Sequence, residues 1–557
     1  MLAFCLLAIL QFVVTLLIGL PAGLLLASST ADKREAAGWL LLTPAIGVTA
    51  YLAFATTFHF AGLGGEKVFY LLLLLPVALV ATLARTSLKR ALWPIGLTLL
   101  GALITIYFNA ADLTFAGLDY FPLTNDDTFS YLGLIDQVRE IGWVKPTISY
   151  PAGFQPLLNH AVDSRAPSAI FVADFAQAFR LETHTAFFVT QRMFLPVTAL
   201  AATGVVMLVT GSIWGACLCL ASLIFGNTLL HQMLQQFNSS AMGTIIGTVF
   251  LAMLVWSGRR ERSLREAVVG YGLAGFAVGT MAITSMEAHP FYLGISGLIF
   301  FFNFLRSRNR RDIVKFGFSF FIGYLGPSML FLLKIWPQIV GQYFLASAMP
   351  AQSIAVPGFL IFLSGISLGI PPKLLQYPPV PMLVAVGTVL TSLGASAYLL
   401  WRSCQPDSST LRSHDGLVLG LFTAAVFALE GFMYAVGIGY GLQKTADYFA
   451  FLNSVAVCVA AVQVAALGKP WEYTAVWLFG LFCIFAYFGK IDVLSNYRGE
   501  TMKGPLPSAY KGDPSANGID LSKLTMEQFN LYLYENRMGS SKIQIPPARS
   551  NRFAPVG

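Results

Sequence analysis

The chain has 557 residues, of which 56% are hydrophobic and only 11% are charged, whereas about a quarter of the residues in an average soluble domain are charged. A water-soluble fold of this length could not cover its surface with so few polar side chains. The formal net charge of +8 does not indicate a nucleic-acid partner, because the basic residues lie in short loops between apolar runs, where membrane topology explains them.

Apolar residues recur along the chain in runs of about 18 to 24, the length that a helix needs to cross a hydrocarbon core of ~30 Å. The sequence therefore predicts an all-α polytopic membrane protein of about 14 transmembrane helices, with one large extracytoplasmic loop of mixed helix and coil. The expected spans are 2–28, 38–58, 67–85, 91–111, 187–210, 213–230, 241–257, 267–285, 290–306, 314–334, 379–401, 415–437, 446–467 and 471–489.

Two long polar stretches interrupt this pattern and divide the chain into parts. The parts are N-terminal transmembrane helices (1–111), an extracytoplasmic catalytic-type loop (112–186), a transmembrane helical core (187–489) and an extracytoplasmic polar tail (490–557). Within the core, the apolar run 357–370 is short enough to be a re-entrant segment. The Lys and Arg residues of the short connections fall on one side, which the positive-inside tendency assigns to the cytoplasm.

The first candidate residues, Asn125, Asp126 and Asp127, lie in the outer loop within YFPLTNDDTFSYLGLIDQVREIGW. An acid at the start of a helix can simply satisfy free backbone N–H groups and interact with the helix dipole. Alternatively, a carboxylate at the membrane surface can deprotonate an acceptor hydroxyl or bind a divalent cation beside a phosphate. Spacing alone leaves both interpretations open.

A second candidate pair, Glu287 and His289, lies in ITSMEAHPFYL at the outer end of the expected eighth span. Ionisable groups within or beside a span are costly, and they are expected to face the protein interior or a water-filled cavity. These two could pair, bind a phosphate or metal, or relay a proton. The alternative is that Pro290 starts the ninth span and the two side chains lie at the interface.

A third group lies in GYGLQKTADYFAF, where Tyr440, Lys444, Asp447 and Tyr448 fall within nine positions. A lysine and aromatic rings at this depth can be membrane anchors. As a functional site, Lys444 would neutralise a lipid-linked phosphate, and the tyrosines would stack on a sugar or cover an isoprenoid. Upstream, within the expected span 415–437, Glu430 is a further intramembrane acid that needs a partner.

NDDTFSY, in a large outer loop directly after a span and leading into a helix, resembles the acidic signature of GT-C membrane glycosyltransferases. The His-Pro at 289–290 and the Tyr-Lys-Tyr arrangement at 440–448 are similar to motifs of GT-C-like families. The resemblance implies a polyprenyl-phosphate sugar as donor and a catalytic acid, here Asp126 or Asp127, which could also hold a divalent cation such as Mg²⁺ or Mn²⁺. The substrate-binding residues that it implies are Asn125, Tyr131, Glu287, His289, Tyr440, Lys444 and Tyr448.

The function expected on this basis is transfer of a hexosyl or pentosyl group to an extracytoplasmic glycan, lipid or protein acceptor, with an outward-facing site in a bacterial inner membrane. An envelope polysaccharide polymerase or ligase is one alternative, and a noncatalytic assembly factor is another. A secondary transporter or lipid flippase would need charges near the bilayer midplane and broken helices in matching halves. The sequence has no Walker-type phosphate loop, dinucleotide glycine signature or paired-His metal motif.

Overall fold

The computed structural model describes residues 2–30, 32–83, 88–108, 166–225, 238–259, 263–306, 309–348, 379–405 and 412–468. It also describes positions 229 and 359 and, within 131–139, all residues except 133 and 137. Every regular element in these parts is a helix, as the sequence predicts. The expected span 471–489 and the tail 490–557 lie outside the described residues.

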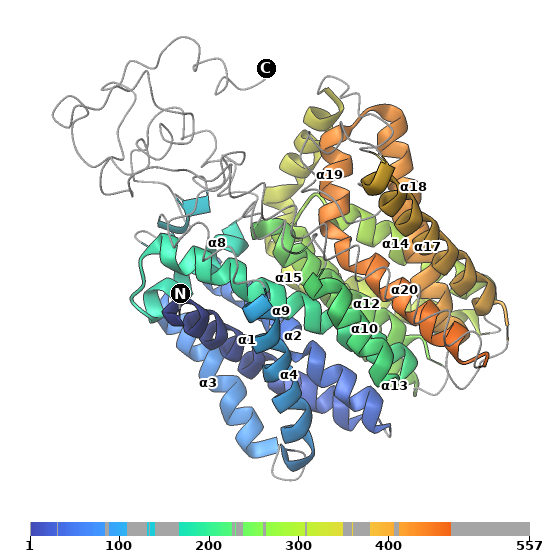
Figure 1. Ribbon diagram of the computed structural model, residues 1–557. Coiled ribbons are helices and arrows are strands. Elements are labelled where there is room, and N and C mark those ends of the chain that lie inside the picture. The colour runs from blue at the N-terminus through green and yellow to red at the C-terminus, as the bar shows by residue number, and fades with distance from the viewer. Residues whose placement is uncertain are drawn as a thin grey trace.

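The helices run roughly parallel to one another, with α1 to α4 at one side of the bundle, α17 to α20 at the other, and α9 and α12 between them (Figure 1). In chain order they are α1 (Leu2–Ser28), α2 (Lys33–Phe60), α3 (Glu66–Leu83), α4 (Leu88–Phe108), α8 (Ala166–Ala178), α9 (Thr183–Thr210), α10 (Ile213–Phe225), α12 (Asn238–Ser257), α13 (Leu264–Thr284), α14 (His289–Arg306), α15 (Arg310–Ala348), α17 (Pro379–Ser403), α18 (Ser413–Val436), α19 (Gly439–Tyr448) and α20 (Ala450–Ala465).

Among the described residues, six helices are long and apolar enough to cross a membrane. They are α1, α2, α9, α12, α13 and α18, and shorter apolar stretches lie in α4, α10, α14 and α20. This confirms the expected helical membrane architecture. The number of about 14 spans stays a prediction, as does the re-entrant run 357–370, of which the structure describes position 359 alone.

Most helix boundaries lie within a few residues of the expected spans, and two regions differ clearly. Helix α15 has 39 residues and continues to Ala348, well past the expected span end at 334, so it is about 58 Å long. The expected span ends at Lys334, but a charged side chain need not end a helix, and α15 continues beyond it. The expected span 446–467 is instead divided at Phe449, which separates the polar helix α19 from the apolar helix α20.

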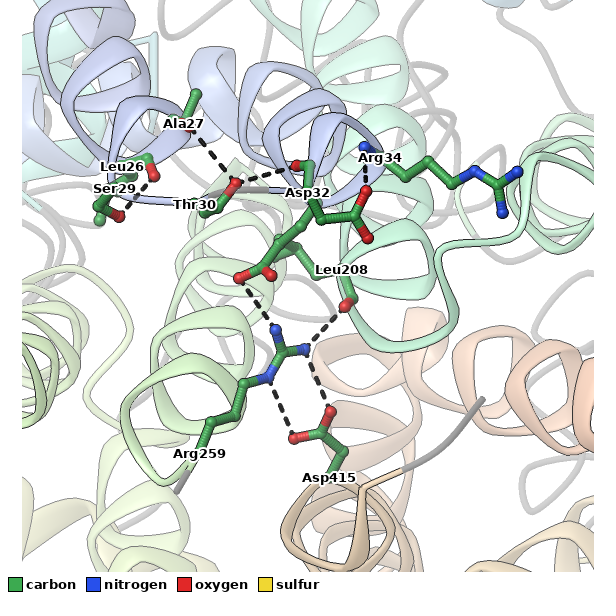
Figure 2. Close-up of polar contacts among 10 residues, drawn as sticks. Leu26, Ala27, Ser29, Thr30, Asp32, Arg34, Leu208, Arg259 and Asp415 are labelled. Carbon is green, nitrogen blue, oxygen red and sulfur yellow. Dashed lines mark hydrogen bonds and ion pairs between the residues drawn. The ribbon is translucent and has the colours of Figure 1, made fainter. Parts of the chain in front are cut away.

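A buried arginine joins four helices at one end of the bundle (Figure 2). Arg259, just beyond α12, contacts Glu35 of α2 at 3.0 Å and Asp415 of α18 at 3.1 Å. Its Nη2 also donates to the backbone carbonyl of Leu208 near the end of α9, at 2.7 Å. The side chains of Arg259 and Asp415 are fully buried.

These contacts place the start of α2, the end of α9, the end of α12 and the start of α18 on one side of the bundle. Basic residues assign three of these connections to the cytoplasmic side, and the alternation of the expected spans assigns the fourth, after α9, to the same side. We therefore call the helix ends on this side the inner ends and the opposite ones the outer ends. That the inner ends face the cytosol stays a prediction.

Candidate functional site

Segments far apart in the sequence meet at the outer end of α12. Ser239, in the first turn of α12, has its hydroxyl 2.9 Å from the Tyr131 hydroxyl, and its backbone carbonyl accepts a hydrogen bond from Ser285 Oγ at 2.6 Å. The Tyr448 hydroxyl of α19 donates to Glu287 Oε2 at 2.6 Å. We call Tyr131, Ser239, Ser285, Glu287 and Tyr448 the outer cluster.

The absence of a side chain at Gly243 lets the two halves of the outer cluster pack on the same face of α12. A Cβ at this position would lie 2.7 Å from Tyr448 Cε1 and 2.8 Å from Ser285 Oγ. Such distances are far inside van der Waals contact, so any larger residue would displace the tyrosine ring or the serine. The glycine therefore allows α19 and the turn after α13 to approach α12 together.

The turn between α13 and α14 carries Glu287 and positions His289. Helix α13 ends at Thr284, and the Ala288 N–H donates to the Ser285 carbonyl at 3.0 Å. His289, the first residue of α14, is 1% exposed, and its Nδ1 lies 2.9 Å from the Met286 carbonyl. Its ring stacks against Tyr324 of α15, with centroids 6.4 Å apart. A histidine whose Nδ1 donates to a carbonyl keeps Nε2 as an acceptor.

Helix α19 brings buried charge to the same region. Lys444 is 7% exposed and Asp447 is fully buried, and Thr244 of α12 donates to the Asp447 backbone carbonyl at 3.2 Å. This helix lies outside the six candidate spans. Burial raises the pKa of the Asp447 carboxyl from 3.8 to about 7, and the positive charge of Lys444 acts in the opposite direction. The region therefore holds a carboxyl that can gain or lose a proton near neutral pH.

A second polar group lies at the outer end of α2, centred on Asp174 of α8. Its carboxylate accepts from the Tyr51 hydroxyl at 2.7 Å, from the Gly65 N–H at 3.1 Å, and lies 2.9 Å from His59 Nε2. Asp174 and His59 are both buried. Because three donors surround the carboxylate, this group fastens α8 to the end of α2 and to the turn before α3.

The comparisons with known proteins add a likeness of general arrangement. No protein-family model and no curated protein matches the sequence. The chain is similar to the apo oligosaccharyltransferase of Archaeoglobus fulgidus, with a TM-score of 0.45 and 12% identity over 75% of this chain and 58% of that one. It therefore spans less than two thirds of that enzyme.

The chain is also similar to ArnT from Cupriavidus metallidurans in the apo state, with a TM-score of 0.45 and 12% identity over 80% of this chain and 85% of that one. The ArnT structure bound to undecaprenyl phosphate gives the same TM-score and identity, over 80% and 86% of the two chains. These solved structures are GT-C membrane glycosyltransferases.

The structure brings together some of the sequence-predicted residues and leaves others outside its description. Tyr131, Glu287 and Tyr448 belong to the outer cluster, and Lys444 lies on the same short helix as Tyr448. Asn125, Asp126 and Asp127 lie outside the described residues, as does the side chain of Tyr440. The roles predicted for all of these residues stay predictions.

Sequence reasoning missed Ser239, Ser285 and Asp174. Serines near helix ends are common, so nothing in the sequence singles out Ser239 or Ser285. Asp174 could have been noticed, because it is an acid in an otherwise apolar stretch. In the part of the chain that the structure describes, no three His, Cys, Asp or Glu side chains are grouped to hold a metal ion. Asp126 and Asp127 lie outside that part, so the cation expected there stays a prediction.

Proposed function

We propose that this protein is a membrane glycosyltransferase of the GT-C type, which moves a sugar from a polyprenyl-phosphate donor to an extracytoplasmic glycan, lipid or protein acceptor. The observation that carries the proposal is the outer cluster, where Tyr131, Glu287 and Tyr448 meet from three segments. Tyr131 and Tyr448 belong to sequence patterns that resemble motifs of this superfamily, and Glu287 lies two positions before a third, the His-Pro at 289–290. An aromatic, acidic and cationic environment of this kind suits a sugar and a phosphate.

Chain connectivity keeps the acidic pair near this cluster. Asp127 lies four positions before Tyr131, and an extended chain spans at most about 3.6 Å per residue. The Asp127 Cα is therefore within about 14 Å of the Tyr131 Cα in any conformation. Since the Tyr131 hydroxyl is fixed at 2.9 Å from Ser239, a carboxylate from NDD can act in the same region as Glu287 and Tyr448.

In the proposed reaction, Asp126 or Asp127 removes the proton of the acceptor hydroxyl, and the hydroxyl oxygen attacks the anomeric carbon of the donor sugar. The configuration at that carbon is inverted. The bond from that carbon to the donor phosphate breaks, and the phosphate leaves as a stable anion that needs no strong general acid. Lys444 would stabilise the charge that develops on it. Asn125 and His289 would bind the sugar or the phosphate.

Two tyrosines and a cation complete the proposed site. Tyr448 would stack on the sugar with its hydroxyl oriented by Glu287, and Tyr440 would cover sugar or isoprenoid. Paired carboxylates such as Asp126 and Asp127 are the oxygen ligands that Mg²⁺ or Mn²⁺ prefers. Such a cation, when bound, would neutralise phosphate charge, and no step above depends on it.

A secondary transporter or lipid flippase is the second candidate, and the buried Glu430 favours it. This side chain is 3% exposed and lies in the membrane-crossing helix α18, where an acid usually marks a substrate or proton path. It lies about 9 Å from the outer end of the helix at Val436, nearer to the outer cluster than a midplane site would be. Substrate uptake by proteoliposomes without sugar transfer would favour transport.

Separate Asp126→Asn and Asp127→Asn variants test the proposed base. Removing a general base typically costs 10²- to 10⁴-fold in rate, so we expect one of the two variants to lose about 100-fold or more of its sugar-transfer activity. The assay is transfer of radiolabelled sugar from a polyprenyl-phosphate donor in membranes. Asp119→Asn, in the same expected loop, is the matched control and should retain activity. Full activity in both variants would remove the base from the mechanism.

The Tyr448→Phe variant tests the outer cluster itself. It removes the hydrogen bond to Glu287 and leaves the ring in place, so transfer should fall by about tenfold, the value of one hydrogen bond to a charged group. Phe449→Tyr, at the next position, alters a ring without touching this hydrogen bond and serves as a control for local packing. Unchanged transfer by Tyr448→Phe would mean that the orientation of Tyr448 has no part in the reaction.

A further inference from the structure

The hydroxyl of Thr183 lies between two side chains of the outer loop. Arg139 Nη1 donates to Thr183 Oγ1 at 2.6 Å, and the same hydroxyl donates to the Asp136 carboxylate. Thr183 and Asp136 are 6% and 9% exposed. Asp136 and Arg139 are three positions apart in a stretch whose described residues are helical, so they project from one face toward Thr183.

Thr183 makes these contacts from the first position of α9 rather than serving as a helix cap. The N-cap residue Glu182 makes no side-chain cap hydrogen bond, although helix starts usually gain stability from one. The polar side chain at the start of this helix is therefore used to hold the outer loop. The Thr183 hydroxyl is used in both directions, as a donor to Asp136 and as an acceptor from Arg139.

Helix α8 holds the same part of the loop from another direction. Gln177 Nε2 donates to the Arg139 backbone carbonyl at 2.7 Å. Helix α8 is itself fastened to the end of α2, through the contacts of Asp174 with Tyr51 and His59. The support under Arg139 is thus tied, through α8, to the membrane-crossing helix α2.

The other end of the stretch is fixed at α12. Tyr131 is 2% exposed, hydrogen bonds to Ser239, and stacks on Phe187 of α9 with ring centroids 6.1 Å apart. Between the two ends, Ile135 and Val138 are buried in the main core. Residues 131–139 are therefore held at both ends, and the acidic NDD lies only four positions before the fixed Tyr131.

We infer that Thr183, through Asp136 and Arg139, is a positioning residue that holds residues 131–139 in place and thereby sets where Asp126 and Asp127 act. The role in catalysis rests on the proposed function, whereas the anchoring does not. Thr183 itself contacts no substrate in this scheme. Its effect reaches the acids through about one and a half turns of helix from Asp136 to Tyr131 and then through the chain.

The anchoring is tested by the accessibility of position 138 in the full-length protein in membranes. A thiol introduced by Val138→Cys should be protected, since Val138 is 4% exposed. Adding Thr183→Val, which keeps the β-branched shape but removes both hydrogen bonds, should raise the rate of labelling by a membrane-impermeant maleimide about tenfold or more. Thr183→Ser keeps the hydroxyl, so in the Val138→Cys protein it should leave the labelling rate unchanged. The protein without Val138→Cys measures the labelling of the native cysteines.

Arg139→Gln gives a second way to break the anchor if Thr183→Val does not fold. It removes the guanidinium donor at a partly buried position and should also speed labelling at position 138. If both variants label as slowly as Thr183→Ser, the anchoring inference is overturned, whatever the activity.

Sugar transfer then tests the consequence for the acids. We expect Thr183→Val to lower kcat about tenfold or more, with Thr183→Ser restoring the parent value. Faster labelling with unchanged kcat would overturn the positioning role. If the parent protein transfers no sugar, the proposed function fails, and the labelling result still decides whether Thr183 anchors the loop.

Discussion

Replacing Arg259 by methionine should destabilise the protein more than removing either of its acidic partners. The guanidinium lies between two carboxylates, 3.0 Å from Glu35 and 3.1 Å from Asp415, with the Arg259 and Asp415 side chains fully buried. Without Arg259, the two carboxylates and the Leu208 carbonyl lose the positive charge that lies between them. Breaking a buried ion pair in this way costs about 3–5 kcal/mol.

Variants of the two acidic partners should lower the unfolding free energy less than Arg259→Met, because each leaves Arg259 paired with the remaining carboxylate. Asp415→Asn leaves Arg259 paired with Glu35 and retains an amide oxygen as acceptor, so we expect a loss of about 1–2 kcal/mol. Glu35→Gln should cost less still, since the Glu35 side chain is 9% exposed and can be partly solvated. The expected order of destabilisation is therefore Arg259, then Asp415, then Glu35.

This order is measured by equilibrium unfolding in mixed micelles, which gives the change in unfolding free energy of each variant. In the Glu35→Gln/Asp415→Asn background, Arg259→Met should cost at least ~1.5 kcal/mol less than in the parent, because no carboxylate is then left unpaired. Arg265→Met removes an exposed arginine at the start of α13 and should stay within about 0.5 kcal/mol of the parent. If Arg259→Met costs no more than Asp415→Asn, water screens these charges and the reasoning from burial is wrong.

Two further predictions concern the outer region and helix packing. The pKa of Asp447 is raised from 3.8 to about 7, so the folded protein binds this proton more tightly than the unfolded chain does. The stabilisation that protonated Asp447 gives at low pH is therefore lost as the pH rises from about 4 to 7. Asp447→Asn should make the free energy of unfolding depend less on pH across this range. Gly275→Ala should destabilise the protein by about 2 kcal/mol or more, because a Cβ there would lie 1.9 Å from the Phe320 carbonyl oxygen of α15. Gly317 has open space around it, so Gly317→Ala is the control and should not destabilise the protein. Thermal unfolding of the two variants and the parent measures the difference.

The sequence by itself determined the helical membrane architecture and the alternation of helix ends. Both depend on local quantities, namely the length of an apolar run and the position of basic residues beside it. The contacts of Arg259 with Glu35, Leu208 and Asp415 agree with that alternation, since they join four helix ends that the expected order of spans places on one side. Helix ends were less predictable, as the extension of α15 to Ala348 shows.

Tertiary structure alone decided which polar residues meet. Tyr448 and Glu287 are 161 positions apart, and Tyr131 and Ser239 are 108 apart, so no local pattern contains the pairing. Thr183 lies before the expected span 187–210, yet its hydroxyl hydrogen bonds to Asp136 and Arg139 far upstream in the sequence. Hydropathy places each residue at a depth along its own helix, but the neighbour that it finds at that depth depends on how the helices pack against one another.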